Sequence, residues 1–127
     1  VQNVRLFLED ACCLLEMLSE PLFETVYLLF PDPWPKKRHE KRRFIGPTNL
    51  NHIARALMPN GTFWVATDHP LYCRWTLDCV RSHPAFEWSA RGPEDWSKRP
   101  EDWTPTRYEV KASKAGRPSA FLKFIRH

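Results

Sequence analysis

The spacing of hydrophobic and polar positions changes repeatedly along the first half of the chain. Val4 to Leu8 is a short apolar run, and Ala11 to Leu18 follows with its leucines on one helical face. Thr25 to Phe30 is a nearly continuous apolar run, which is typical of a buried parallel strand. A second helix is expected from Pro47, a favourable first-turn residue, to the turn at Pro59-Asn60-Gly61. This alternation predicts an α/β sheet with crossover helices.

The second half of the chain continues the alternation and ends in antiparallel strands. Thr62 to Thr67 is expected to form a strand, and Pro70 to His83 has helical periodicity. Ala85 to Ala90 and Ala120 to Arg126 alternate apolar and polar residues, which predicts antiparallel strands at one side of the sheet. Between them, Arg91 to Pro118 is expected to be irregular, and it carries the motif Pro-Glu-Asp-Trp twice. A tryptophan-containing loop of this length is usually functional.

The glycines are too few and too scattered to form a glycine-rich loop. They are Gly46, Gly61, Gly92 and Gly116. A doubly wound sheet normally holds a nucleotide at the turn between its first strand and first helix. Because no such turn is present, and because the chain begins with Val1 rather than Met, we expect an N-terminal half to precede it.

Composition and cysteine usage indicate one globular domain inside the cell. With 43% hydrophobic residues, the 127-residue chain has enough apolar side chains for a core. No apolar run approaches the roughly 20 residues that cross a bilayer, and no secretory signal is visible. The four cysteines contain no C-x-x-C pair. They are therefore expected to be reduced thiols in a cytoplasmic protein that binds neither metal nor membrane.

Nearly all of the cationic excess lies in one octapeptide, residues 36–43. It holds six basic residues and one acidic residue, whereas the rest of the chain holds 13 basic and 14 acidic residues. A solvated helix face normally interleaves the two signs. This cluster therefore predicts contact with a polyanion.

A proline-rich segment, Phe30 to His39, joins the predicted buried strand to this octapeptide. Ligands of open α/β sheets bind beyond the carboxyl ends of strands, so Asp32 is placed where chemistry is expected. The prolines at 31, 33 and 35 stiffen the segment and reduce the entropy lost on ordering Asp32 and Trp34. The alternative interpretation is a rigid loop with a capping Asp32 and a packed Trp34.

These residues resemble a known family. Phe30 to Arg43 is similar to the signature of bacterial tRNA (guanine-N7)-methyltransferases, and so are Thr67-Asp68 and Thr106 to Glu109 with the following Lys111-Ala112. The resemblance implies a Rossmann-like class I methyltransferase sheet and the cofactor S-adenosylmethionine. It makes residues 1–127 the C-terminal part of a single methyltransferase domain that lacks the first two strands and the glycine-rich loop. Val4 to Leu8 is then the third strand, and the chain alone is expected to be inactive.

The resemblance also implies a role for each matched residue. Asp10 would bind the adenine amine of the cofactor, although a strand-end cap is the alternative, and Asp32 would lie between methyl donor and guanine. Lys36, Asp68 and the Thr106 to Glu109 segment would bind the substrate. The implied sets are substrate binding by Lys36, Asp68, Thr106, Arg107, Tyr108 and Glu109, and tRNA binding by Arg38, His39, Glu40, Lys41, Arg42 and Arg43. Arg107 or Glu109 is equally compatible with an exposed ion pair.

The chemistry of the proposed reaction fits this set of side chains. Guanine N7 has a free lone pair, so its methylation needs no strong base, and positive charge develops on the ring. A carboxylate about 4 Å away stabilises that charge by up to roughly 4 kcal/mol at an effective dielectric near 20. N7 lies in the deep groove of A-form RNA, so the target is expected to be unstacked, with Trp34 as the candidate stacking partner.

Two other interpretations remain open at the level of sequence. Asp32-Pro33-Trp34 faintly resembles the Asp-Pro-Pro-Tyr loop of exocyclic-amine methyltransferases, which would change the methylated atom. A non-catalytic RNA-binding module would explain the octapeptide but would leave Asp32 and Asp68 without a role.

Overall fold

A four-stranded mixed sheet forms the centre of the protein. The computed structural model describes residues 2–127. The strands are β1 (Phe23–Leu29), β2 (Leu57–Thr67), β3 (Phe86–Trp88) and β4 (Ala120–Arg126), and they lie in the order β1-β2-β4-β3. β1 runs parallel to β2, whereas β4 is antiparallel to both β2 and β3. The predicted α/β class and the antiparallel pair at one side of the sheet are confirmed.

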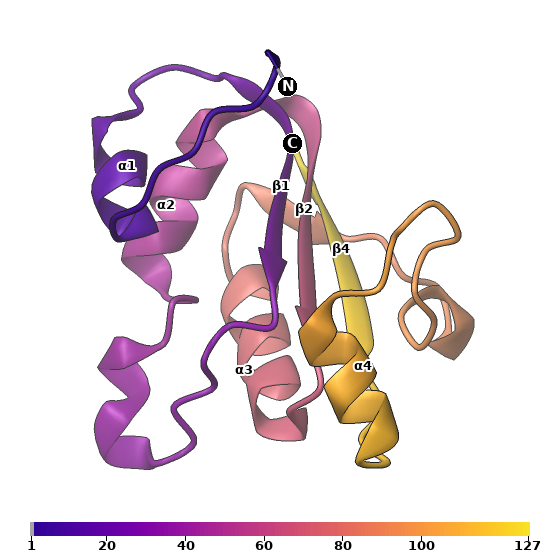
Figure 1. Ribbon diagram of the computed structural model, residues 1–127. Helices are drawn as coiled ribbons and strands as arrows, with labels where there is room; N and C mark the ends of the chain where they lie inside the picture. Colours follow the sequence, from indigo (N-terminus) through magenta and orange to yellow (C-terminus); the bar gives the residue numbers. More distant parts are fainter. Residues whose placement is uncertain (1) are drawn as a thin grey trace.

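The helices alternate with the strands, and the first three lie where the sequence pattern predicts helices. They are α1 (Ala11–Met17), α2 (Pro47–Ala56), α3 (Pro70–Arg81) and α4 (Arg107–Lys114), with short 3-10 turns at Lys37–Arg42 and Pro93–Asp95. Figure 1 shows β1, β2 and β4 side by side, with α4 in front of the sheet and α1 beside α2. Pro at the first turn of both α2 and α3 costs no hydrogen bond, because those N–H groups have no partner within the helix.

One face of the sheet forms the main core. Cross-strand pairing places Val26, Phe63 and Phe124 in one row and Leu28, Val65 and Leu122 in the next. The apolar faces of α2 and α3 cover these rows. The fully buried contributors from the helices and the strands are Leu50, Ile53, Tyr72, Val80, Phe63, Val65, Leu122 and Phe124.

The opposite face carries a second, aromatic cluster centred on Trp103. Its ring lies 5.2 Å from Tyr27, 5.0 Å from Trp64 and 5.8 Å from Phe121, in edge-on arrangements that aromatic rings prefer. Trp103 belongs to the second Pro-Glu-Asp-Trp copy, whereas Trp96, from the first, packs against the main core. The segment between β3 and β4 is thus fixed to both faces of the sheet.

The structure corrects three predicted elements. Val4 to Leu8 forms no strand, and these residues are exposed. β2 begins at Leu57, directly after α2, so the expected turn at Pro59-Asn60-Gly61 lies within the strand as a bulge. The register shows the bulge: Phe23 pairs with Leu57, whereas Thr25, two residues on, pairs with Thr62. The third correction is α4, which lies within the segment expected to be irregular. This helix is mostly polar, and Ala112 is its one fully buried residue.

Strand β1 has one paired edge. Among the described residues its ladder partner is β2, and its other edge carries no strand. Large apolar side chains are exposed along and near this edge, including Leu22, Phe23, Tyr27 and Leu29 at 38–54% exposure. An unpaired, apolar strand edge is a site where a further strand can add.

Gly61 provides a test of the bulge in β2. A Cβ at this position would lie 2.8 Å from the carbonyl oxygen of Met58 and 3.0 Å from that of Glu24. We expect Gly61→Ala to lower the free energy of unfolding by about 1–3 kcal/mol, because backbone atoms must move to admit the methyl group. Urea denaturation measures this change. Gly92→Ala is the matched control, since its Cβ would meet open space and its φ is extended; equal losses in the two variants would contradict the account.

Candidate active site

The loop after β1 holds two aromatic residues in left-handed backbone conformations. Phe30 has φ 52° and Trp34 has φ 40°, and each precedes a proline. Such conformations cost on the order of 1–3 kcal/mol each and concentrate at functional sites. Between them, an Oδ1 atom of Asp32 accepts a hydrogen bond of 3.3 Å from the Trp34 amide. The loop therefore presents the exposed Asp32 carboxylate from a strained and stiff backbone.

The basic octapeptide continues from this loop as a 3-10 turn. Most of its cations are exposed, namely Lys36, Lys37, Arg38, Lys41 and Arg42. The guanidinium of Arg42 lies 5.1 Å from the centre of the Trp34 ring, and the His39 ring meets Trp34 edge-on at 5.5 Å. Trp34 is thus partly covered by its own octapeptide. His39 and Glu40 are half-buried beside it.

Arg43 has a different place from the one predicted for it. The residue is 7% exposed, so it offers little surface for the expected contact with the tRNA backbone, which stays a prediction. The guanidinium stacks 4.5 Å from the centre of the Trp75 ring, and its Nε atom donates to the carbonyl of Trp34 at 3.1 Å. Arg43 therefore fixes the proline loop to helix α3. A charge pattern alone does not distinguish this buried arginine from its exposed neighbours.

Helix α3 also holds the chain immediately after the octapeptide. The Tyr72 hydroxyl accepts a hydrogen bond from the Ile45 amide, and the Trp75 indole donates to the Ile45 carbonyl at 2.9 Å. Burial raises the pKa of Tyr72 to about 12, so this phenol stays protonated at neutral pH. The C-terminal end of the exposed basic turn is thereby anchored to the core.

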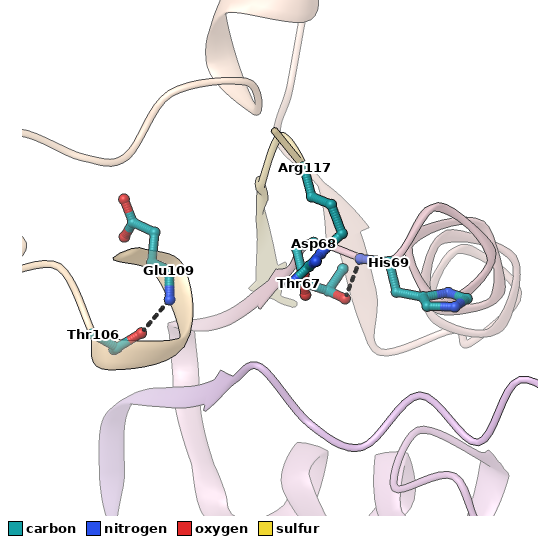
Figure 2. A network of polar contacts seen from close by, with 6 residues as sticks. All are labelled: Thr67, Asp68, His69, Thr106, Glu109 and Arg117. Carbon is teal, nitrogen blue, oxygen red and sulfur yellow. Dashed lines mark hydrogen bonds and ion pairs between the residues drawn. The ribbon is translucent and has the colours of Figure 1, made fainter. Parts of the chain in front are cut away.

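Asp68 follows the carboxyl end of β2, the strand next to β1. Its Oδ2 atom accepts a hydrogen bond of 2.7 Å from Nε of Arg117, and its side chain is 25% exposed (Figure 2). The preceding Thr67 is buried, and its hydroxyl accepts from the amide of His69. Because β1 and β2 are parallel neighbours, with Leu29 opposite Ala66, Asp32 and Asp68 follow strand ends at the same edge of the sheet.

The Thr106 to Glu109 segment begins helix α4. The Thr106 hydroxyl accepts from the Glu109 amide at 3.1 Å, as Figure 2 shows, which makes Thr106 the N-cap. The Glu109 carboxylate forms an ion pair of 2.6 Å with Arg99. The ion-pair alternative is therefore confirmed for Glu109, whose side chain is 16% exposed. Arg107 and Tyr108 point into solvent, exposed and available to a ligand.

Asp10 caps helix α1. Its Oδ1 atom accepts a hydrogen bond of 2.9 Å from the Cys12 amide, so Asp10 is a helix N-cap rather than the strand-end cap named as the alternative. Its carboxylate has a second oxygen and lies exposed, which leaves an acceptor for an amine such as that of adenine. Capping and ligand binding are therefore compatible at this residue.

The cavities divide the site residues into two groups. A cavity of about 380 Å³ lies beside Asp68, His69 and Trp96, and one of about 190 Å³ lies between β1 and α4 and touches Thr106 and Glu109. Asp32 lines neither of them. Asp68 thus lies at one cavity, and Thr106 and Glu109 lie at another. Asp32 and Asp10 are instead exposed on the open surface.

Three side chains of the site were not foreseen from the sequence. Arg99 and Arg117 pair with the predicted carboxylates, and Trp103 fixes the intervening segment against β1. For Trp103, the repeated Pro-Glu-Asp-Trp motif was a usable signal. The arginine pairs join residues 10 and 49 positions apart, and nothing in the local pattern indicates them.

Within residues 2–127, no three or more His, Cys, Asp and Glu side chains are grouped so that they could hold a metal ion. None of the helices in that part of the chain has the length and apolar character needed to cross a membrane.

Comparison with known proteins places the chain in a family. Residues 1–122 match the family described as "Putative methyltransferase". Proteins named tRNA (guanine-N(7)-)-methyltransferase are similar to it: that of Rhodospirillum rubrum is 50% identical over 99% of this chain, and that of Azorhizobium caulinodans is 53% identical over 98%. The relative from Zymomonas mobilis is 44% identical over 99%. The chain spans about half the length of these curated relatives: the match covers between 49% and 54% of the relative's sequence in the three cases. On the match to the family model, which covers nearly the whole sequence, this chain belongs to that methyltransferase family.

Proposed function

We propose that this chain is the substrate-binding, C-terminal part of a tRNA (guanine-N7)-methyltransferase that uses S-adenosylmethionine. One observation carries the proposal. A strained loop presents Asp32 beside a cluster of exposed cations, at the same sheet edge as Asp68. The names of relatives that are 44–53% identical support the same reaction and the same substrate class. Because the substrate is tRNA, we place the activity in the cytoplasm.

The open edge of β1 supports an incomplete class I methyltransferase sheet. We infer that the first two strands and a glycine-rich cofactor loop are supplied by a preceding segment that pairs along β1. Exposed Tyr27 and Leu29, and the exposed Val4 to Leu8 run, would then be buried against it. Val4 to Leu8 would become a strand in that setting, since a strand forms when its ladder partners are present. All 127 residues are thus part of one methyltransferase domain.

The residues present fit one side of a cofactor site. Asp10 and Asp32 offer exposed carboxylate oxygens, which suit an adenine amine and a cationic sulfonium. The four glycines of the chain are too scattered to form a glycine-rich loop that could cradle the cofactor. When bound, S-adenosylmethionine supplies an electrophilic methyl group. We therefore expect the chain alone to bind it weakly, and to methylate only when the sheet is complete.

Asp32 supplies the electrostatic part of the mechanism. Guanine N7 attacks the methyl group with its own lone pair, so no side chain has to remove a proton. Positive charge develops on the imidazole ring of the base, and a fixed carboxylate next to it lowers the energy of the transition state. The proline loop pre-organises Asp32 for this task, because its orientation is set before the substrate arrives.

Asp68 and the start of α4 hold the target base. A carboxylate accepts hydrogen bonds from the Watson–Crick edge of guanine, which has N–H donors at N1 and N2. Asp68 is partly enclosed beside its cavity, where such bonds are stronger than in open water. Thr106, Arg107, Tyr108 and Glu109 would close over the base from the other side. Lys36, the first cation after the proline loop, contacts the substrate next to them.

The exposed cations of the octapeptide bind the tRNA backbone. Arg38, Lys41 and Arg42 are exposed and are held as a group by the anchors at Arg43 and Ile45. His39 and Glu40 complete the turn and lie against it, half-buried. Phosphate contacts give orientation without reading the sequence, so this surface would dock any tRNA that presents its target guanosine at the correct distance.

A transfer assay tests the proposed function. Let the completed enzyme be this chain fused to the part of the Rhodospirillum rubrum relative that it does not match. We expect the completed enzyme to transfer a labelled methyl group from S-adenosylmethionine to tRNA, and the 127-residue chain alone to transfer none. Calorimetry should show cofactor binding by the completed enzyme and weak or no binding by the chain. Absence of transfer by the folded, cofactor-binding completed enzyme would overturn the proposal.

A further inference from the structure

The ion pairs of the protein are concentrated at the proposed substrate site. Within residues 2–127, two arginine–carboxylate pairs meet the distance for an ion pair, Arg99–Glu109 at 2.6 Å and Arg117–Asp68 at 2.7 Å. Each takes a carboxylate already assigned to substrate binding and an arginine that has no role so far. Partly exposed pairs of this kind contribute about 0–1 kcal/mol to stability. The small contribution of these pairs to the stability of the fold therefore does not explain why they lie at this site.

The backbone of Arg117 is held in place on both sides. Gly116 adopts φ 76° just after α4, and the Arg117 amide donates back to the Ala112 carbonyl at 2.9 Å. The Gly116 amide donates to the Ser113 carbonyl at 3.0 Å, which completes a Schellman motif. Pro118 follows at once and restricts the backbone of Arg117, the residue before it. The backbone at the end of α4 thus fixes the direction in which the Arg117 side chain leaves it.

The side chain of Arg117 holds Asp68 by one of its two oxygens. Nε donates to Oδ2, and the Arg117 side chain is 50% exposed while that of Asp68 is 25% exposed (Figure 2). A carboxylate has acceptor sites on both oxygens, so this contact leaves Oδ1 for the donors of a base. The pair therefore orients the Asp68 carboxylate and leaves its Oδ1 atom as an acceptor for a ligand.

We propose that Arg117 is a positioning residue that holds Asp68 in the orientation in which it binds the target guanine. This inference rests on the proposed function, because it assigns Arg117 a role through Asp68. The same helix carries Thr106 to Glu109 in its first turn and Arg117 just beyond its last. The Arg117–Asp68 pair therefore also ties the C-terminal end of α4 to the end of β2.

A double-mutant cycle in the completed enzyme tests this inference. Arg117→Ala is expected to lower kcat/KM for tRNA by about 10- to 100-fold, since a small misplacement of a binding group costs that much. Asp68→Ala should lower it by a similar or larger factor. The double variant should be within about threefold of Asp68→Ala, because residues that act as a unit are not additive. Arg117→Lys should recover part of the loss, and cofactor binding should be unchanged in all variants.

Controls separate this role from folding and from the proposed function itself. Lys114→Ala removes an exposed cation from the last turn of α4 and should leave kcat/KM unchanged. Losses that multiply in the double variant, or no loss in Arg117→Ala, would overturn the positioning role while the unmodified completed enzyme still methylates tRNA. A completed enzyme that binds cofactor but methylates no tRNA would instead overturn the proposed function, and this inference with it.

Discussion

Asp32→Ala in the completed enzyme is expected to lower kcat by about 100- to 1,000-fold, which is the range for loss of one pre-organised electrostatic group. The Kd for tRNA should stay within about threefold of the unmodified value, because the exposed cations that bind phosphate remain in place. Single-turnover methyl transfer measures the first quantity, and fluorescence anisotropy measures the second. The loss is expected in the reaction step, because the role proposed for Asp32 is to stabilise charge that develops only there.

Asp32→Asn separates charge from loop geometry. An asparagine keeps an Oδ1 acceptor for the Trp34 amide, so the turn that presents residue 32 is preserved. The carboxylate charge is gone. We expect the kcat of the Asp32→Asn variant to be nearly as low as that of Asp32→Ala. A near-normal rate with Asn would mean that residue 32 serves only to shape the loop, and equal losses of binding and rate with Ala would lead to the same conclusion.

Replacing the exposed octapeptide cations by glutamine should remove most of the salt dependence of tRNA binding. With four phosphate contacts, log Kd is expected to change with log salt concentration at a slope of magnitude about 3 to 4. Binding by the unmodified enzyme then weakens about 100-fold between 50 and 200 mM salt. The variant with Lys37, Arg38, Lys41 and Arg42 all changed to Gln keeps Lys36, and it should show a slope of magnitude about 1 or less and weak binding throughout.

Arg43 provides the internal control for this experiment. It belongs to the same run of cations, but its guanidinium is buried against Trp75. Arg43→Gln should leave the slope nearly unchanged and should lower the free energy of unfolding, since a buried hydrogen bond to the Trp34 carbonyl is lost. A slope that falls equally in both variants would contradict the division between exposed and buried cations.

Local pattern predicted most of the sheet, because strand and helix periods depend on neighbours in sequence. β1, β4 and the helices α1 to α3 lie within a few residues of their expected bounds. Helix α4 was missed, since it is short and mostly polar and packs with one fully buried residue. Yet Thr106 and Glu109 have the spacing of a capping box, and Thr106 does cap the helix. That signal was visible in the sequence.

Features that depend on distant residues could not be predicted. Val4 to Leu8 has the composition of a strand, but a strand also needs partners for its backbone groups, and none of the described residues pairs with it. Arg43 and Arg117 look like ordinary surface cations. Their roles come from Trp75 and Asp68, which the chain brings to them across 32 and 49 positions.

The atom that receives the methyl group tests the central claim most directly. Methylation at N7 labilises the guanine ring, so reduction and aniline treatment cleave the tRNA backbone at that nucleotide. We predict that tRNA treated with the completed enzyme and S-adenosylmethionine is cleaved at a guanosine, and that the product digests to 7-methylguanosine. A methyl group found on an exocyclic amine nitrogen, with no cleavage, would contradict the account.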